Sequence, residues 1–192
     1  IDAGLVPVAL VCNPDEPVGR KKILTAPPTK AVIMNYESGI KNEIQILQPE
    51  KLDRKFIDSL FKIHDSYDIF IVAAYNKIIS EEIINIPKFK TIGVHPSLLP
   101  KYRGASPIQT AILNGEKETG IDLYLMDKDI DHGPVLASAK CEILEKDNYE
   151  TMEVKLAELG AKLLVDNLSK YLAGNLKPKE QNHSQATFTK KF

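Results

Sequence analysis

The sequence predicts an α/β fold in which helices cover both faces of a doubly wound, mostly parallel sheet. Three observations carry this prediction. Short apolar runs typical of buried strands recur along the chain, segments with helical spacing of apolar residues separate them, and no internal repeat or low-complexity stretch interrupts them. With 192 residues, the chain is long enough to build one domain around a sizeable core.

The first third of the chain alternates these two patterns. The apolar run at 8–11 is ended by Asn13-Pro14, and a proline-rich stretch follows it. Proline is tolerated at a helix start, which favours a helix from Pro28. The expected elements are a buried strand over 8–11, a loop over 14–28, a helix over 28–37 closed by Gly39, a strand over 43–47 and an amphipathic helix within 50–66.

The remaining two thirds continue the alternation. Residues 121–126 alternate apolar and polar side chains, which predicts a half-buried strand with 135–143 as its antiparallel partner. The other expected elements are a buried strand over 68–74, a short helix over 80–84 capped by Ser80, a strand over 91–94 that ends at His95, a helix over 106–113, and a long amphipathic helix over 148–172.

The composition gives no sign of general attraction to nucleic acid or to membranes. The formal net charge is −1, so no overall field draws the protein to nucleic acid or membrane, and no apolar run approaches the length of a membrane span. A contact with a polyanion must therefore come from local clusters such as Arg20-Lys21-Lys22 or Lys101-Tyr102-Arg103. The alternative interpretation of these clusters is solvated surface without a binding role. Cys12 and Cys141 lie in apolar runs without metal-ligand spacing, and we expect reduced thiols.

Polar residues follow two of the predicted strands. Ligands bind beyond the carboxyl ends of strands in such sheets, which places Tyr75-Asn76 and His95 on one rim. A histidine there can stabilise an oxyanion or carry a proton near neutral pH, although a structural role is also open. Asp131 is either a turn-former or a base that orients the imidazole. Ser97 lacks the glycine-flanked elbow of a serine nucleophile.

Several motifs carry a family resemblance. The stretches His95-Pro-Ser-Leu-Leu-Pro100, Arg103-Gly-Ala-Ser-Pro-Ile-Gln109, Gly115-Glu116, Thr119-Gly120 and Asp131-His-Gly-Pro134 closely resemble the formyltransferase family that uses 10-formyltetrahydrofolate. The similarity spans nearly the whole chain, up to Gln181–Phe188. It implies the Rossmann-like formyltransferase fold and one catalytic domain over 1–192, which lacks the family's first strand and any C-terminal barrel domain.

The resemblance also implies roles for residues. His95 would stabilise the oxyanion while Asp131 holds the histidine or helps to remove the amine proton. No metal is implied, and 10-formyltetrahydrofolate is the expected co-substrate. Its expected binding residues are Tyr75, Asn76, Ile78, Ile79, Ser97, Leu98, Leu99, Pro100, Met126 and Asp127.

The acceptor implied by the resemblance is an amine. The chain is most similar to the members that act on initiator methionyl-tRNA, and Arg20, Lys21, Lys22 and Arg103 are its expected tRNA-binding residues, through phosphate contacts. Such an enzyme is expected in the cytoplasm, as a monomer, without membrane contact. The alternatives are an enzyme for another amine such as a nucleotide-linked amino sugar, a folate-binding relative without catalysis, and a formyltetrahydrofolate hydrolase.

Two positions depart from the family pattern. The family has an asparagine two residues before the histidine as an oxyanion donor, and this chain has Gly93 there. Loss of one such donor costs about 2.7–4 kcal/mol in other enzymes. Asn76, where the tRNA-directed members commonly have glycine, is the hypothetical substitute donor.

Overall fold

The computed structural model describes residues 1, 3–36 and 43–191, and the chain divides into two compact units, residues 1–66 and 67–192. In the first unit, β1 (Ala9–Val11) pairs in parallel with β4 (Gln45–Leu47). The helices of this unit are α1 (Pro28–Met34) and α2 (Arg54–Ile63). The predicted closure of the first helix at Gly39 lies outside the described residues.

Helix α2 forms where the sequence predicts an amphipathic helix. The side chain of Asp53 accepts the backbone N–H of Phe56 at 3.2 Å and caps the first turn. Phe56, Ile57 and Leu60 are buried on one face. The helix therefore owes its position to this apolar stripe, as the spacing indicated.

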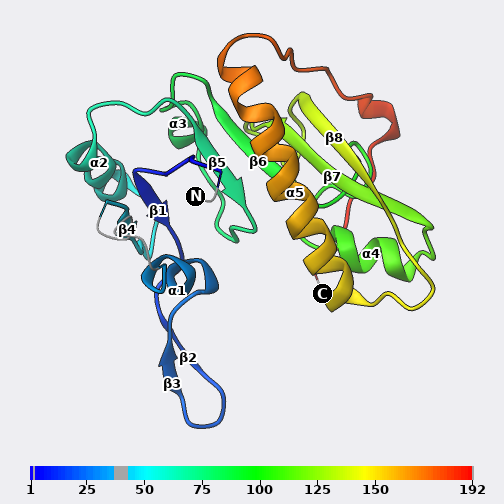
Figure 1. The fold of residues 1–192 in the computed structure, drawn as a ribbon, viewed down its shortest axis with the longest axis horizontal. Coiled ribbons are helices and arrows are strands. Elements are labelled where there is room, and N and C mark those ends of the chain that lie inside the picture. Colours follow the sequence, from blue (N-terminus) through cyan, green and yellow to red (C-terminus); the bar gives the residue numbers. More distant parts are fainter. Residues whose placement is uncertain (2, 37–42, 192) are drawn as a thin grey trace. The chain divides into compact units, whose positions relative to one another are not determined.

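The first unit also contains a hairpin where the sequence predicted only a loop. Strands β2 (Glu16–Val18) and β3 (Ile23–Thr25) pair antiparallel and extend away from the rest of their unit (Figure 1). Gly19 and Lys22 have positive φ, and the Lys22 N–H donates to the Gly19 carbonyl at 3.1 Å, which closes the turn. Every residue of both strands is exposed, so no burial pattern marked them in the sequence.

The second unit is built on a four-stranded sheet in the order β5-β6-β7-β8. Its strands are β5 (Phe70–Ala73), β6 (Thr91–His95), β7 (Glu118–Leu125) and β8 (Val135–Glu142). Strands β5 and β6 are parallel, and the β7–β8 pair is antiparallel as predicted. The α/β class with parallel strand pairs is confirmed.

This larger sheet carries more antiparallel pairing than the sequence indicated, because β6 and β7 are also antiparallel. The register pairs His95 with Asp122 and Ile92 with Leu125, so β7 begins beyond the carboxyl end of β6. The connecting segment, which contains α4 (Pro107–Leu113), therefore does not cross back along the sheet as a parallel connection requires.

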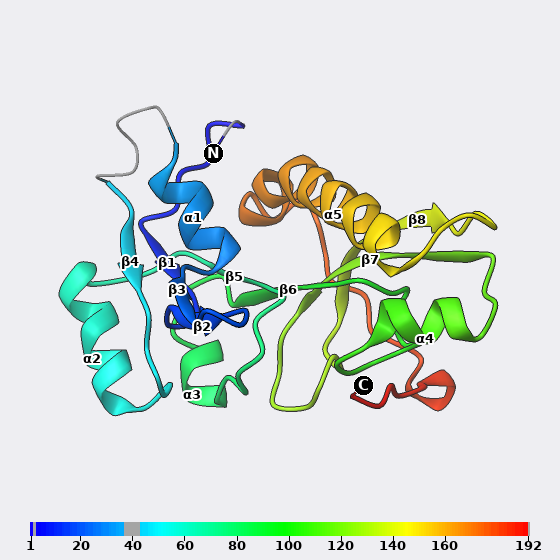
Figure 2. The same cartoon turned by 90° about the horizontal axis from the view of Figure 1, so that it is seen from below.

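Helix α5 (Tyr149–Leu172) covers one face of the sheet, and the short α3 (Glu81–Ile84) lies on the other side (Figure 2). A capping box between Asn148 and Thr151 starts α5. The core beneath it consists of two clusters of buried side chains: Ile92, Leu123, Leu136 and Leu168, and Ile108, Ile121, Met152 and Leu156.

The face opposite α5 carries polar residues. Side chains alternate along a strand, so His95 shares the face of Thr91, whose hydroxyl donates to the Ile84 carbonyl of α3 at 2.8 Å. Asp122 and Tyr124 of β7 alternate with the core residues Ile121 and Leu123 in the same way. This face positions the site. Among the described residues, no helix is long and apolar enough to cross a membrane.

Candidate active site

His95 is the last residue of β6 and is 6% exposed. Its Nε2 lies 2.9 Å from the carbonyl oxygen of Tyr102. A carbonyl only accepts, so this contact assigns the proton to Nε2. The other ring nitrogen, Nδ1, faces Oδ2 of Asp131 at 3.5 Å. The strand end and the turn that carry these two residues are thus brought together.

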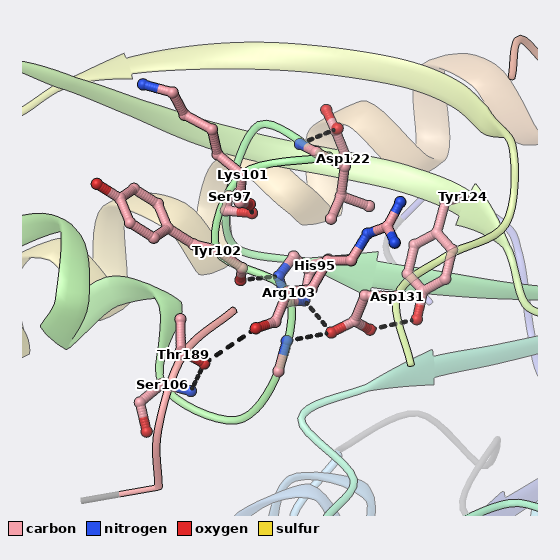
Figure 3. Close-up of polar contacts among 12 residues, drawn as sticks. His95, Ser97, Lys101, Tyr102, Arg103, Ser106, Asp122, Tyr124, Asp131 and Thr189 are labelled. Carbon is pink, nitrogen blue, oxygen red and sulfur yellow. Dashed lines mark hydrogen bonds and ion pairs between the residues drawn. The ribbon is translucent and has the colours of Figure 1, made fainter. Parts of the chain in front are cut away.

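Asp131 lies in the turn between β7 and β8, in the left-handed region with φ of 48°. Its Oδ2 accepts the backbone N–H of Gly104 at 2.7 Å, and its Oδ1 accepts the hydroxyl of Tyr124 at 2.7 Å (Figure 3). The carboxylate is therefore held on two sides while Oδ2 also faces the imidazole.

The geometry favours one proton position during a reaction. With the proton on Nε2, Nδ1 and the Asp131 carboxylate are both acceptors, so no hydrogen bond joins them directly. When Nδ1 takes a proton, it gains a carboxylate partner in a site where His95 and Asp131 are both largely buried. The pair is therefore suited to hold a proton taken from a substrate.

Gln181 braces the turn that carries Asp131. Its Nε2 donates to the carbonyls of Asp131 at 3.0 Å and Gly133 at 2.7 Å, and its Oε1 accepts from Nη2 of Arg103 at 2.7 Å. Arg103 is 3% exposed, and the same Nη2 lies 2.9 Å from Nδ1 of His183. A guanidinium so buried does not present itself to a polyanion, so the predicted role of Arg103 as a tRNA contact does not fit its position.

The loop after His95 is tied down by its own polar groups. The Ser97 hydroxyl donates to the Lys101 carbonyl at 2.6 Å, and the Leu99 N–H donates to Oδ2 of Asp122 at 2.7 Å. Burial raises the pKa of Asp122 to about 6, against the lowering effect of hydrogen bonds from Ser138 and Leu99. Ser97 is fully buried and its side chain holds this loop, so its predicted place among the folate-binding residues does not fit its burial.

The other predicted folate residues divide between two loops. In the loop after β5, Tyr75 and Ile79 are half-buried, Asn76 is exposed, and Ile78 is 92% exposed. The His95 ring contacts Tyr102 and Asp131, and Asn76 is not among these partners. The remaining predicted residues are all half-buried: Leu98, Leu99 and Pro100 after β6, and Met126 and Asp127 after β7.

The loop after β7 contains a small acidic cluster. Asp127 accepts from the Asp129 N–H at 3.0 Å and contacts Nδ1 of His132 at 2.7 Å. One ligand atom from each of these three residues lies within 4.8 Å of the others, a spacing that would fit a metal ion. Their mutual contacts already account for this grouping, because the Asp127–His132 pair is itself an ion pair when the imidazole is charged.

The predicted basic contacts lie in the first unit. Arg20, Lys21 and Lys22 are all exposed, in and beside the turn that joins β2 to β3. Three adjacent cations at the end of a projecting hairpin are available to an anionic ligand.

Three residues of the site were missed by the sequence interpretation: Asp122, Tyr124 and Gln181. The first two belong to the polar side of the strand over 121–126, which the alternation predicts to be half-buried and to which it assigns no role in the site. Because Gly93 pairs with Tyr124 and His95 with Asp122, that face is the wall of the site. The alternation itself was the available signal.

A buried histidine–carboxylate pair at the end of a strand in an α/β sheet is typical of α/β enzymes that move protons. The chain belongs to the formyl transferase family, whose model matches residues 3–168. It is 42% identical over 185 residues to the methionyl-tRNA formyltransferase of Sulfurihydrogenibium sp. (strain YO3AOP1), covering 95% of this chain and 57% of that protein. The methionyl-tRNA formyltransferase of Dictyoglomus turgidum is likewise 42% identical, over 96% of this chain and 57% of the relative. The chain thus spans little more than half the length of these curated relatives.

Solved structures share the fold. The phosphoribosylglycinamide formyltransferase from Bacillus halodurans superposes with a TM-score of 0.67 at 22% identity, over 90% of this chain and 85% of that chain. The formyltransferase PseJ from Anoxybacillus kamchatkensis, solved in complex with UDP-4,6-dideoxy-4-formamido-L-AltNAc and tetrahydrofolate, gives a TM-score of 0.65 at 21% identity, over 94% and 84%. These similarities establish the formyltransferase fold.

Proposed function

We propose that this chain is the formyl-transferring part of a methionyl-tRNA formyltransferase, which moves a formyl group from 10-formyltetrahydrofolate to the amino group of methionyl initiator tRNA. The observation that carries the proposal is the 42% identity to methionyl-tRNA formyltransferases over 95% of this chain. The buried His95–Asp131 pair supports it, because the reaction must move a proton from the attacking amine.

The proposed reaction is a direct transfer. The neutral amine of the methionyl group attacks the formyl carbon, and the carbonyl oxygen gains negative charge. The bond from that carbon to N10 of the folate then breaks. The amine loses one proton and N10 gains one, so the products are formylmethionyl-tRNA and tetrahydrofolate.

His95 and Asp131 would handle the proton and the developing charge. A proton received at Nδ1 makes the ring an imidazolium beside the Asp131 carboxylate, and that charge stabilises the oxyanion. Asp131 keeps the ring oriented and balances its charge. Such acid–base assistance contributes about 10²–10⁴-fold to rate in other enzymes.

The loop after β5 is the proposed platform for the folate. Ile78 offers an almost fully exposed apolar side chain, and Tyr75 and Ile79 are half-buried beside it in sequence. These residues fit an aromatic pterin, which is bound by apolar contacts and oriented by a few polar groups. Asn76 stays a proposed oxyanion donor. No metal takes part in the proposed transfer.

The hairpin tip is the proposed tRNA contact. Arg20, Lys21 and Lys22 are exposed and would pair with phosphates, which gives binding that weakens with salt. The same proposal places the enzyme in the cytoplasm, where aminoacylated tRNA is used. We also propose that it acts as a monomer.

The test is a turnover assay of the purified chain with 10-formyltetrahydrofolate and methionyl-tRNA. We expect formylmethionyl-tRNA, and we expect His95→Asn to lower its formation at least 100-fold. The matched control is His64→Asn, which changes an exposed histidine at the end of α2. Formate release without any acceptor would instead indicate a hydrolase. Formylation of a nucleotide-linked amino sugar, but not of methionyl-tRNA, would indicate an enzyme for that other amine. Folate binding without turnover would indicate a folate-binding relative without catalysis.

A further inference from the structure

Gly93 and Tyr124 face each other across the pair of strands β6 and β7. A Cβ atom at position 93 would lie 2.3 Å from Cε1, 2.5 Å from Cζ and 2.8 Å from Oη of Tyr124. Real side chains do not approach so closely, so the phenol ring occupies the space that a side chain at 93 would take. Only glycine at this position leaves room for the ring.

The hydroxyl in that space is a hydrogen-bond donor. Tyr124 is 4% exposed, and its Oη donates to Oδ1 of Asp131 at 2.7 Å (Figure 3). Burial and the nearby carboxylates of Asp131 and Asp127 raise the pKa of the phenol, so it keeps its proton. The ring also stands edge-on to the His95 imidazole, with centroids 6.4 Å apart.

The two carboxylate oxygens of Asp131 therefore have separate partners. The Tyr124 hydroxyl holds Oδ1, and the Gly104 N–H holds Oδ2, which is also the oxygen that faces Nδ1 of His95. With only the Gly104 contact, the carboxylate could rotate about its own axis. The phenol fixes that rotation.

We propose that Tyr124 is a positioning residue of the active site, whose hydroxyl aims the Asp131 carboxylate at His95 in the space that Gly93 leaves open. The inference rests on the proposed function and deepens it. It also explains why position 93 is glycine: without a side chain there, the Tyr124 ring can reach Asp131. The phenol does not touch the substrate in this scheme and acts through Asp131.

The first test removes only the hydroxyl. Tyr124→Phe keeps the ring, and we expect kcat to fall about 10- to 100-fold, the range for a lost hydrogen bond to a charged group, with KM little changed. The matched control is Tyr171→Phe, which removes a half-buried hydroxyl that donates to the Phe89 carbonyl at 2.9 Å in the core under α5. The control should keep full activity. Equal kcat for Tyr124→Phe and the unaltered protein would overturn the proposal.

The second test needs no substrate. A structure of Tyr124→Phe should show the Asp131 carboxylate turned, so that Oδ2 no longer lies 3.5 Å from Nδ1 of His95. A structure of Tyr171→Phe should keep that distance unchanged. An unmoved Asp131 carboxylate in Tyr124→Phe contradicts the inference even if the unaltered protein forms no formylmethionyl-tRNA, which would by itself refute only the proposed function.

A third variant tests the link to Gly93. Gly93→Ala must displace the ring, so it should lower kcat and turn the Asp131 carboxylate as Tyr124→Phe does. In the double variant the two losses should not multiply, because both act by removing one hydroxyl from Asp131. Multiplied losses would show that position 93 acts independently of Tyr124. Thermal unfolding of each variant confirms that the folded protein is being compared.

Discussion

Asp122 accepts the backbone N–H of Leu99 at 2.7 Å while being only 1% exposed, so a buried carboxyl group in β7 holds the loop that follows His95. Burial raises its pKa from 3.8 to about 6. The unfolded chain releases this proton near pH 4, whereas the folded chain keeps it until about pH 6. Stability must therefore change between these two values.

We expect the free energy of unfolding to fall as the pH rises from about 4 to about 6, because the folded state binds more protons over this range. The full fall attributable to Asp122 is about 3 kcal/mol, and this contribution of Asp122 is constant at pH values well above 6. Asp122→Asn should remove this slope, as measured by urea unfolding at several pH values. Glu118→Gln, at an exposed position of the same strand, is the control and should keep the slope.

The carboxylate of Asp131 is expected to be required for turnover. Asp131→Asn keeps the shape of the side chain but removes the charge that faces Nδ1 of His95, so kcat should fall by about 10²–10⁴-fold. Asp129→Asn is the matched control, because Asp129 is an exposed aspartate of the same loop. Turnover of Asp131→Asn near that of the unaltered protein would contradict the proposed proton path.

The hairpin tip can be tested by reversing its charge. Arg20→Glu with Lys21→Glu should weaken tRNA binding and reduce the slope of log affinity against log salt by about one for each lost phosphate contact. Binding measured at several salt concentrations gives both quantities. Lys51→Glu with Lys55→Glu makes the same change of charge at exposed positions of the same unit and should leave both unchanged.

The packing of α5 on the sheet predicts that truncating a buried side chain between them lowers the free energy of unfolding strongly. Leu123 is 1% exposed and lies in the cluster with Ile92 and Leu168. Leu123→Ala should lower the free energy of unfolding by about 2–5 kcal/mol, because it removes buried methyl groups and leaves a cavity. Leu113→Ala, at a leucine that is 70% exposed, should change it by less than about 0.5 kcal/mol in the same denaturant titration.

Much of the fold follows from local patterns in the sequence. The apolar stripe and the Asn148 cap predict α5, and the alternation over 121–126 predicts β7 with its antiparallel partner. The hairpin over 16–25 gave no such signal, because all its strand residues are exposed. Alternation of apolar and polar residues indicates that one face of a strand is buried. Neither face of this projecting hairpin is buried, so its sequence shows no such alternation.

Residues of the candidate site could be predicted where they lie at the end of an expected strand or in an expected turn. His95 follows an apolar run, and Asp131 lies in a turn of aspartate, glycine and proline, so both could be singled out. The contacts between them depend on strand register, which pairs Gly93 with Tyr124 and is fixed only by the folded sheet. The burial of Arg103 was equally hidden, because its partner Gln181 comes from far along the chain.

Gln181 gives the segment after α5 a part in the active site. The match to the family model covers residues 3–168, but the amide of Gln181 contacts the turn of Asp131 and the side chain of Arg103. A fragment trimmed at the end of α5 would retain the strands β1 to β8 and the side chains of His95 and Asp131 while losing the contacts of Gln181. Removal of the segment from residue 173 onward should therefore lower the proposed formyl transfer even where the sheet stays folded.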